Sequence, residues 1–423
     1  MVLKRIFAIK SVVDFIYMFF SNIAIKAFGF LREIILAYFF GSSLLYSFYI
    51  LLRTAADFLS QFTFGNALQS NILPKLSKHF QDYGKVSYNN LFAFTISSFI
   101  YIFLASQIIQ CIIIWMLDSE YSLQLFIISL LLSLLIVLNF FNSVFMTVLQ
   151  AEGRFKDYAL GSTLNIFVST LFLYPFAFFF NVVGIVFSRI IGVLVLAKQY
   201  ILPILQREDS NEVEISVKDF SLSVLFLGNF PSIILLTSRF IAGTDGDNNI
   251  AYFNYAVVLL NVVLTAVIAN INTIMLRKLS IKKEIKWLLY SIFTALGCGI
   301  LLYLLAHNFS EDLIRIIYYR GAFTDIDVLE TASYFRQMSL AIIILLFSSV
   351  LSQPYFTLDI KVRNQYSRNL LFIILLSFVL IISFLYVNSW DARYRSLIIL
   401  YSMSCVNLVI ATFTCIKYFK HES

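Results

Sequence analysis

Charged residues are scarce in this chain. Only 13% of its 423 residues are Asp, Glu, Lys or Arg, whereas 60% are hydrophobic and the mean hydropathy is +0.86. A soluble domain of ordinary composition carries about 25% charged residues. The scarcity excludes a soluble globular protein and indicates a chain that crosses a membrane several times.

Cysteine and histidine are also scarce, and they do not cluster. The four cysteines lie inside apolar runs without a CxxC pair, and the three histidines are scattered over loops and the C-terminal tail. This pattern predicts neither a disulfide framework nor a metal site. Since no nucleophile or base is clustered either, we expect a protein that is not an enzyme and that holds no cofactor.

Apolar runs long enough to cross a bilayer are abundant. About twenty apolar residues span the hydrocarbon core. Twelve such runs can be counted, at about residues 8–40, 44–74, 90–117, 123–150, 157–180, 182–205, 219–242, 250–276, 286–306, 333–358, 367–387 and 396–416. We therefore predict an all-α polytopic membrane protein of twelve transmembrane helices. A turn at Gly41-Ser42-Ser43 is expected to join the first two.

The basic residues predict the orientation of these spans. Cytoplasmic loops of membrane proteins are enriched in Lys and Arg. If the N-terminus is cytoplasmic, 21 of the 31 basic residues fall in cytoplasmic segments and five in external ones. Both termini are then cytoplasmic. The net charge of +7 reflects this orientation, so we expect no binding of nucleic acid.

Two segments near the membrane surface need separate interpretation. The first apolar run is too long for a signal peptide and contains Arg32, which indicates a retained helix. The longest external segment covers residues 307–336. In it, Leu313, Ile316 and Ile317 lie opposite Arg315 and Arg320, which predicts a short amphipathic helix at the membrane interface.

A weak internal repeat points to two lobes. Residues 72–78 (ILPKLSK) and 275–281 (MLRKLSI) are identical at four aligned positions. Six helices in each half give both halves the same orientation, as in transporters that expose one site alternately to each side. We predict an N-terminal six-helix lobe over residues 1–206, a cytoplasmic linker over 207–218 and a C-terminal six-helix lobe over 219–423.

Ionisable residues interrupt the apolar runs. In the first two runs they are Lys26, Arg32, Glu33, Arg53 and Asp57. Each costs roughly 2.5–3.5 kcal/mol at the centre of a membrane helix, so such residues usually face a partner or a watery cavity. We expect these five to line a polar cavity for an anionic, lipid-linked substrate. Arg189 and Arg239, in the sixth and seventh runs, are weaker candidates.

Arg32 is the strongest of these candidates. A guanidinium can bind phosphate through two parallel hydrogen bonds and stays charged at any accessible pH. The alternative is a structural ion pair with an acid on a neighbouring helix, because Glu33 points about 100° away. Lys26 would reach the same cavity if the helix bends at Gly29. Otherwise its side chain extends to the membrane interface.

The remaining candidates have structural alternatives too. Arg53 and Asp57 are spaced i, i+4 on one helix, so they can pair with each other. Such a pair either eases membrane insertion or releases its arginine when substrate arrives. Arg189 and Arg239 lie toward the ends of their spans, where an arginine can extend to the interface.

Five short motifs occur in order along the chain. The opening helix contains GFLRE (residues 29–33) and AYFFG (37–41), and NILP (71–74), LQAEGRF (149–155) and YRGAF (319–323) follow. The first two resemble the signature GFxRD…ARxFG of the MurJ (MviN) lipid-flippase family, and the other three are similar to later segments of that family. It belongs to the multidrug/oligosaccharidyl-lipid/polysaccharide (MOP) exporter superfamily.

The resemblance implies a flippase that moves an undecaprenyl-pyrophosphate-linked sugar across the bacterial inner membrane, with cavity arginines that hold the pyrophosphate. Arg32 matches one such arginine. Glu33 replaces the family's Asp, and Lys26 stands where another arginine is expected. Ser60 and the segment 255–258 (YAVV) replace further charged positions. The family usually has two more C-terminal helices than the twelve predicted here.

These departures leave the glycan open between a peptidoglycan precursor and an O-antigen or exopolysaccharide unit. The expected partners are a polyprenyl-pyrophosphate-linked sugar and membrane lipids, and we expect a monomer. The driving force could be the membrane potential or an ion gradient. Two other functions stay open: an ion-coupled multidrug exporter of the same superfamily, and a membrane scaffold for glycan assembly that transports nothing.

Overall fold

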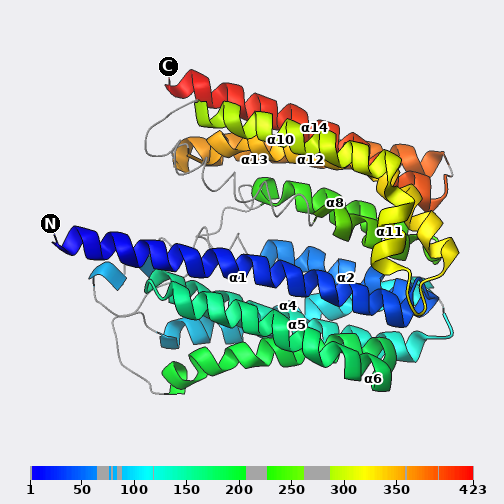
Figure 1. The fold of residues 1–423 in the computed structure, drawn as a ribbon, viewed down its shortest axis with the longest axis horizontal. Helices are drawn as coiled ribbons and strands as arrows, with labels where there is room; N and C mark the ends of the chain where they lie inside the picture. The colour runs from blue at the N-terminus through cyan, green and yellow to red at the C-terminus, as the bar shows by residue number, and fades with distance from the viewer. Residues whose placement is uncertain are drawn as a thin grey trace. The chain divides into compact units, whose positions relative to one another are not determined.

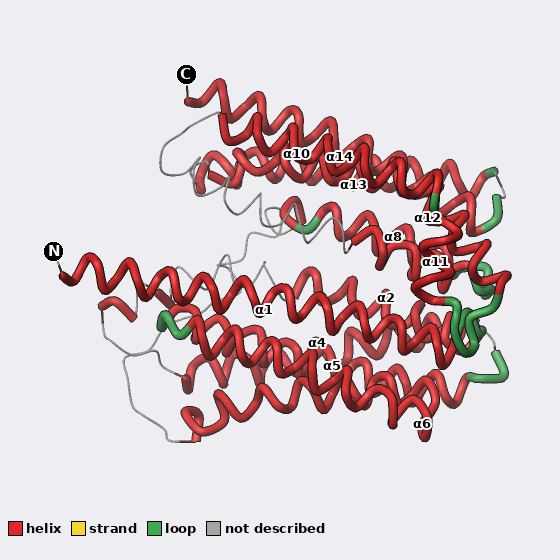
Figure 2. Tube along the Cα trace, viewed as in Figure 1, coloured by secondary structure: helices red, strands yellow, loops and turns green. Residues whose placement is uncertain are grey.

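The computed structural model describes residues 2–63, 76–77, 80–82, 88–117, 119–205, 226–261, 286–357, 360–388 and 390–422. In these ranges the chain forms helices and turns and no strand (Figure 2). The labelled helices are α1 (Val2–Phe40), α2 (Leu44–Thr63), α4 (Tyr88–Leu117), α5 (Ser122–Ala151), α6 (Phe155–Leu205), α8 (Phe230–Ala242), α10 (Lys286–Asn308), α11 (Ser310–Tyr318), α12 (Asp325–Ser352), η2 (Gln353–Thr357), α13 (Ile360–Val387) and α14 (Ala392–Glu422). Residues 249–261 form a further helix.

Seven of the described helices are long and apolar enough to cross a membrane. They are α4, α5, α6, α10, α12, α13 and α14, and α8 is a shorter apolar helix. A helix satisfies all its internal backbone hydrogen bonds, which is why it is the stable form of such segments in lipid. The chain is therefore a multi-pass, all-helical membrane protein. The number twelve and the cytoplasmic position of the termini stay predictions.

Several predicted boundaries agree with the structure. α1 ends at Phe40 and α2 begins at Leu44, which confirms the turn between them. The helix that contains the predicted tenth span begins before it: α12 starts at Asp325, whereas the predicted apolar span starts at residue 333. A capping box explains the earlier start: the Thr324 side chain accepts a hydrogen bond from Asp327 N, and the Asp327 carboxylate accepts one from Thr324 N.

The amphipathic stretch also forms the short helix expected of it, α11. Ile314 and Tyr318 are its buried apolar side chains, whereas Ile316 is 69% exposed. α11 therefore packs one face on the protein and leaves an apolar residue on the other.

The chain divides into two compact units. The first contains Met1–Phe39 and Ala55–Phe220, and the second contains Phe40–Thr54 and Ser221–Ser423. The predicted linker 207–218 and the repeat segment 275–281 lie outside the described residues, as does most of the segment 72–78. The proposed lobe boundaries and the internal repeat therefore stay predictions.

In the first unit, α6 is a hairpin of two antiparallel helices. The chain reverses at Asn181. Its φ of 52° and ψ of −141° lie outside the left-handed helical region, in a conformation that glycine adopts most readily. The Asn181 side chain accepts a hydrogen bond from Val182 N at 2.8 Å. A reversal at this residue agrees with the predicted spans 157–180 and 182–205.

Close backbone contact holds the two arms of α6 together. A Cβ at Gly184 would lie 2.0 Å from the carbonyl oxygen of Phe176, and one at Gly192 would lie 2.5 Å from that of Asn165. Only glycine allows the arms to approach this closely. α1 packs beside the hairpin, where Ser21 Oγ donates to the carbonyl of Ala159 at 2.9 Å.

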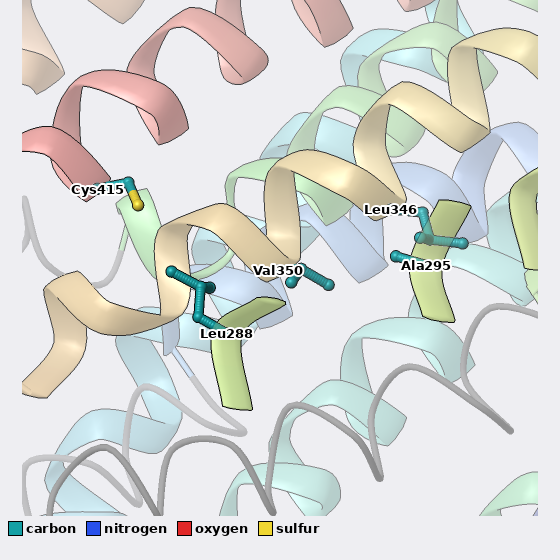
Figure 3. Packing of buried hydrophobic residues seen from close by; sticks show 5 residues of the cluster. All are labelled: Leu288, Ala295, Leu346, Val350 and Cys415. Atoms are coloured by element: carbon teal, nitrogen blue, oxygen red, sulfur yellow. The ribbon is translucent and has the colours of Figure 1, made fainter. Parts of the chain in front are cut away.

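In the second unit, α12 packs against α10 and α14, and α14 packs against α8 (Figure 1). An apolar cluster joins three of these helices and consists of Leu288, Ala295, Leu346, Val350 and Cys415 (Figure 3). Each member is at most 8% exposed. The position of Cys415 in this cluster agrees with the interpretation of the cysteines as apolar packing residues.

The turn after α1 packs with the second unit rather than the first. Gly41 has φ +49°, and its carbonyl accepts a hydrogen bond from the Tyr255 hydroxyl at 2.8 Å. Ser42 Oγ donates to the buried carboxylate of Asp327. Beneath the turn, Tyr46 stacks on Tyr255. The start of α2 is thus fixed to residues more than 200 positions later in the chain.

Candidate functional site

A cavity of about 160 Å³ lies inside the first unit, between α1, α5 and both arms of α6. Its lining consists of Arg32, Leu135, Asn139, Asn165, Ile166, Ser169, Arg189 and Val193. Two of these eight residues are arginines, three are neutral and polar, and none is acidic. The cavity is therefore a basic, polar site within an otherwise apolar helix bundle.

Arg32 enters the cavity from α1. Arg32 is only 6% exposed, and most of its neighbours on α1 are apolar. Removing a charged group from water is costly unless other groups compensate. Its chain neighbour Glu33 is equally buried but does not line the cavity. This arrangement is what a helix requires, because consecutive side chains point in different directions.

Arg189 reaches the same cavity from the second arm of α6, with Val193 one turn later. The first arm contributes Asn165 and Ser169, which are also one turn apart. The hairpin at Asn181 makes this possible, because it folds the second arm back along the first. Two arginines 157 positions apart in sequence therefore share one site.

The neutral lining residues add hydrogen-bonding groups. The amide groups of Asn139 and Asn165 each carry two N–H donors and an acceptor oxygen. The Ser169 hydroxyl donates to the carbonyl of Ile166 at 2.9 Å, which leaves its oxygen as an acceptor. Guanidinium and amide donors without a carboxylate are a set that suits an anion better than a cation.

The other predicted residues lie elsewhere. Lys26 is half-buried on α1, about 9 Å along the axis from Arg32. Helical structure continues through Gly29 between them. Arg53 and Asp57 are one turn apart on α2 and half-buried. None of these three lines the cavity, so their roles stay predictions.

Arg239 lies in the second unit, on α8. It is 8% exposed and donates from Nη1 to Asn254 Oδ1 at 3.0 Å. Asn254 belongs to the helix over residues 249–261 and is 1% exposed. The structure thus places Arg239 in a buried hydrogen bond, not at the interface to which an arginine near a helix end could extend.

Three residues of the cavity were not predicted from the sequence: Asn139, Asn165 and Ser169. A usable signal was present, since Asn165 and Ser169 are spaced i, i+4 in a run that is otherwise mostly apolar. Polar residues at this spacing share a helix face. The face they share is the one that the hairpin turns toward Arg189.

A second, smaller cavity in the second unit has a different character. It has a volume of about 70 Å³, and its polar lining comes from Ser349, Ser352, Gln353, Tyr355, Asn407 and Thr414. No charged side chain lines it. Within the described part of the chain, no group of three His, Cys, Asp or Glu residues is placed to hold a metal ion. The basic cavity is therefore the site on which we base a functional proposal.

No protein-family model matches the chain, and no curated protein sequence matches it. Solved structures do match. The lipid II flippase MurJ in an inward closed conformation has a TM-score of 0.71 at 17% identity, over 97% of this chain and 88% of that chain. An outward-facing MATE family multidrug resistance transporter of the MOP superfamily has a TM-score of 0.61 at 14% identity, over 96% of this chain and 94% of that chain.

A third structure is a MOP superfamily transporter from Pyrococcus furiosus, reported to have a binding pocket of reverse polarity. Its TM-score is 0.51 at 14% identity, over 98% of this chain and 94% of that chain. The chain therefore has the fold shared by the MurJ flippase and the MATE transporters of the MOP superfamily, as the motifs predicted. These neighbours are transporters and flippases rather than enzymes.

Proposed function

We propose that this protein is a flippase that moves a polyprenyl-pyrophosphate-linked glycan across the bacterial inner membrane by alternating access. The observation that carries the proposal is the basic cavity around the buried Arg32, in a protein with the MurJ and MATE fold. The MurJ neighbour is described as a lipid II flippase. The glycan here would be a peptidoglycan precursor or an O-antigen or exopolysaccharide unit.

The charge of the cavity supports an anionic substrate. A pyrophosphate must lose much of its hydration to cross the membrane, and this loss is costly for a charged group. A buried guanidinium offsets it through charge-assisted hydrogen bonds, which are about twice as strong as neutral ones. Arg32 is buried and lines the cavity, so it is the residue to which we assign the pyrophosphate.

The same charge disfavours the multidrug exporter as an alternative. A cation-coupled exporter requires a buried acid facing its ion site, and none of the eight cavity residues is acidic. The scaffold alternative makes no demand on a buried arginine. Flipping itself requires no covalent chemistry: the sugars move through water-accessible space while the polyprenyl chain stays in lipid.

The test is a flipping assay in proteoliposomes with an undecaprenyl-pyrophosphate-linked sugar. Arg32→Ala is expected to lower the flipping rate at least tenfold, because one charge-assisted, two-point contact of about 1.5–3 kcal/mol is lost. The flipping rate of Arg32→Lys should lie between those of the wild type and Arg32→Ala, since lysine keeps the charge but lacks the planar guanidinium. Arg315→Ala is the matched control, because this arginine is exposed on α11 and pairs with Asp325.

Normal flipping by Arg32→Ala, in protein that folds like the wild type, would contradict the assignment of Arg32. Export of a cationic drug by the wild-type protein, without movement of lipid-linked sugar, would instead support the exporter. In cells, depletion of a flippase should cause lipid-linked sugar to accumulate on the cytoplasmic side, whereas loss of a scaffold should stop its synthesis.

A further inference from the structure

The hairpin of α6 determines where Arg189 lies. Close backbone contacts between the two arms occur before and after Arg189 in the sequence, at Gly184 and at Gly192. The contact at Gly192 is with Asn165, itself a cavity residue, whose side-chain oxygen would also lie 2.8 Å from a Cβ there. The register of the two arms is therefore set directly beside the cavity, and it places Arg189 opposite the polar face of the first arm.

The lining of the cavity is rich in donors from several directions. Each guanidinium has five N–H groups, and Asn139 and Asn165 add amide donors. Arg32 comes from α1 and Arg189 from α6, so their donors do not share one helix face. A tetrahedral oxyanion has several acceptor oxygens that point in different directions. It fits such a lining better than a planar or monatomic anion does.

The two positive charges also favour an anion between them. Two positive charges that line one partly enclosed cavity in an apolar helix bundle repel each other more strongly than they would in water. A bound oxyanion replaces this repulsion with two attractive, hydrogen-bonded contacts. The cavity volume of about 160 Å³ is sufficient for a phosphoryl group and a few waters.

We propose that Arg189 is a second anion-binding residue, which together with Arg32 holds one phosphate-type oxyanion in this cavity. The proposal rests on the proposed function of the cavity and goes further by naming a second arginine and the chemical class of the group bound. The oxyanion is either the phosphoryl group of the lipid-linked substrate or a free inorganic phosphate or pyrophosphate.

Binding measurements on the purified full-length protein test the proposal. The probes are inorganic phosphate and inorganic pyrophosphate with protein in detergent, and undecaprenyl pyrophosphate with protein in nanodiscs. Affinity is obtained from the rise in melting temperature with probe concentration. The variants are Arg189→Ala, Arg189→Lys, Arg32→Ala and the double alanine variant. Arg336→Ala is the control, because Arg336 is an exposed arginine of α12 that contacts Ser310.

Arg189→Ala should weaken binding of the effective probe at least tenfold, and Arg189→Lys should weaken it less. The double variant should bind little more weakly than either single variant, because both arginines hold the same group and their effects are not additive. Melting temperatures without probe show whether each variant is folded. Binding by a free anion or only by the lipid identifies the source of the oxyanion, and both results support the site.

Two results would overturn the proposal and are distinguishable. If Arg32→Ala loses binding and flipping while Arg189→Ala keeps both, the proposed function stands and the role of Arg189 is wrong. If both variants bind every probe as the wild type does and flip normally, the cavity is not the substrate site and both proposals fall.

Discussion

Replacement of Gly41 by alanine should strongly destabilise the second unit. Gly41 ends the AYFFG motif, and Ala322 belongs to the YRGAF motif, so two distant segments that carry the family resemblance touch here. An alanine Cβ at position 41 would lie 2.4 Å from the carbonyl oxygen of Ala322 and 2.9 Å from its carbonyl carbon. Both are backbone atoms, so relief requires movement of the chain.

Two contributions set the size of the effect. The φ of +49° is unfavourable for alanine by about 1–2 kcal/mol. The overlap with Ala322 is a form of overpacking, which typically costs about 1–3 kcal/mol. The expected loss for Gly41→Ala is therefore about 2–5 kcal/mol. Because Ser42 and the Tyr255 hydroxyl bind the same turn, some of this loss will come from strained hydrogen bonds.

Two other glycines separate these contributions. Gly153 has φ +71°, but no atom lies within 4 Å of the place that a Cβ would take, so Gly153→Ala should cost only about 1–2 kcal/mol. Gly29 is helical and equally unobstructed, so Gly29→Ala should stabilise α1 by about 0.5–1 kcal/mol. Melting temperatures should rank Gly29→Ala above the wild type, then Gly153→Ala, then Gly41→Ala.

Loss of helical circular dichroism on heating in detergent measures this ranking, because it reports on both units. A thiol-reactive dye adds a readout of the second unit, since Cys415 is 8% exposed in its apolar cluster and reacts when that unit opens. Cys405 is exposed and Cys111 and Cys298 are half-buried, so a background with these three changed to Ser removes their early signal. If Gly41→Ala melts no lower than Gly153→Ala, the contact with Ala322 is absent. If Gly41→Ala has the melting temperature of the wild type, the positive φ assigned to Gly41 is also contradicted.

Three further outcomes are expected. Ser42→Ala should destabilise the protein by about 1.5–3 kcal/mol through loss of a buried bond to the Asp327 carboxylate, measured by the same thermal assay. Burial raises the pKa of the Asp247 carboxyl, in the turn between α8 and residue 249. Because the pKa is higher in the folded state, the contribution of Asp247 to the free energy of unfolding is greatest below its unfolded-state pKa and declines as pH rises through its folded-state pKa. Asp247→Asn should remove that decline from a pH series of melting temperatures. Asn181→Ala should cost about 0.5–1.5 kcal/mol, because it loses the hydrogen bond from Val182 N. Asn181→Gly should be nearly neutral, because glycine adopts this backbone conformation with little strain, which offsets the same loss.

Local sequence properties determined most of the helical architecture. A run of apolar residues in lipid must satisfy its own backbone hydrogen bonds, so a helix follows from the run itself. This is why the end of α1 at Phe40, the start of α2 at Leu44 and the reversal at Asn181 agree with the predicted spans. Hydropathy does not detect every helix start, however, since α12 begins at a polar capping box before the predicted apolar span.

The candidate site was only partly accessible from the sequence. The burial of Arg32 was predictable, because a charge inside an apolar run must find a polar environment. That Arg32 shares its cavity with Arg189, and not with Lys26, Arg53 or Asp57, was not predictable.

That pairing depends on how the arms of a hairpin are registered against each other and against α1. The register is set by close contacts at single glycines, and hydropathy and charge spacing along one helix do not record it. The attachment of the turn at Gly41 to Ala322 has the same origin. The sequence by itself determined which segments are helices and that Arg32 needs a polar environment. Only the tertiary structure decided which charged residue shares the cavity with Arg32, because that choice depends on contacts between helices, such as that of Gly192 with Asn165.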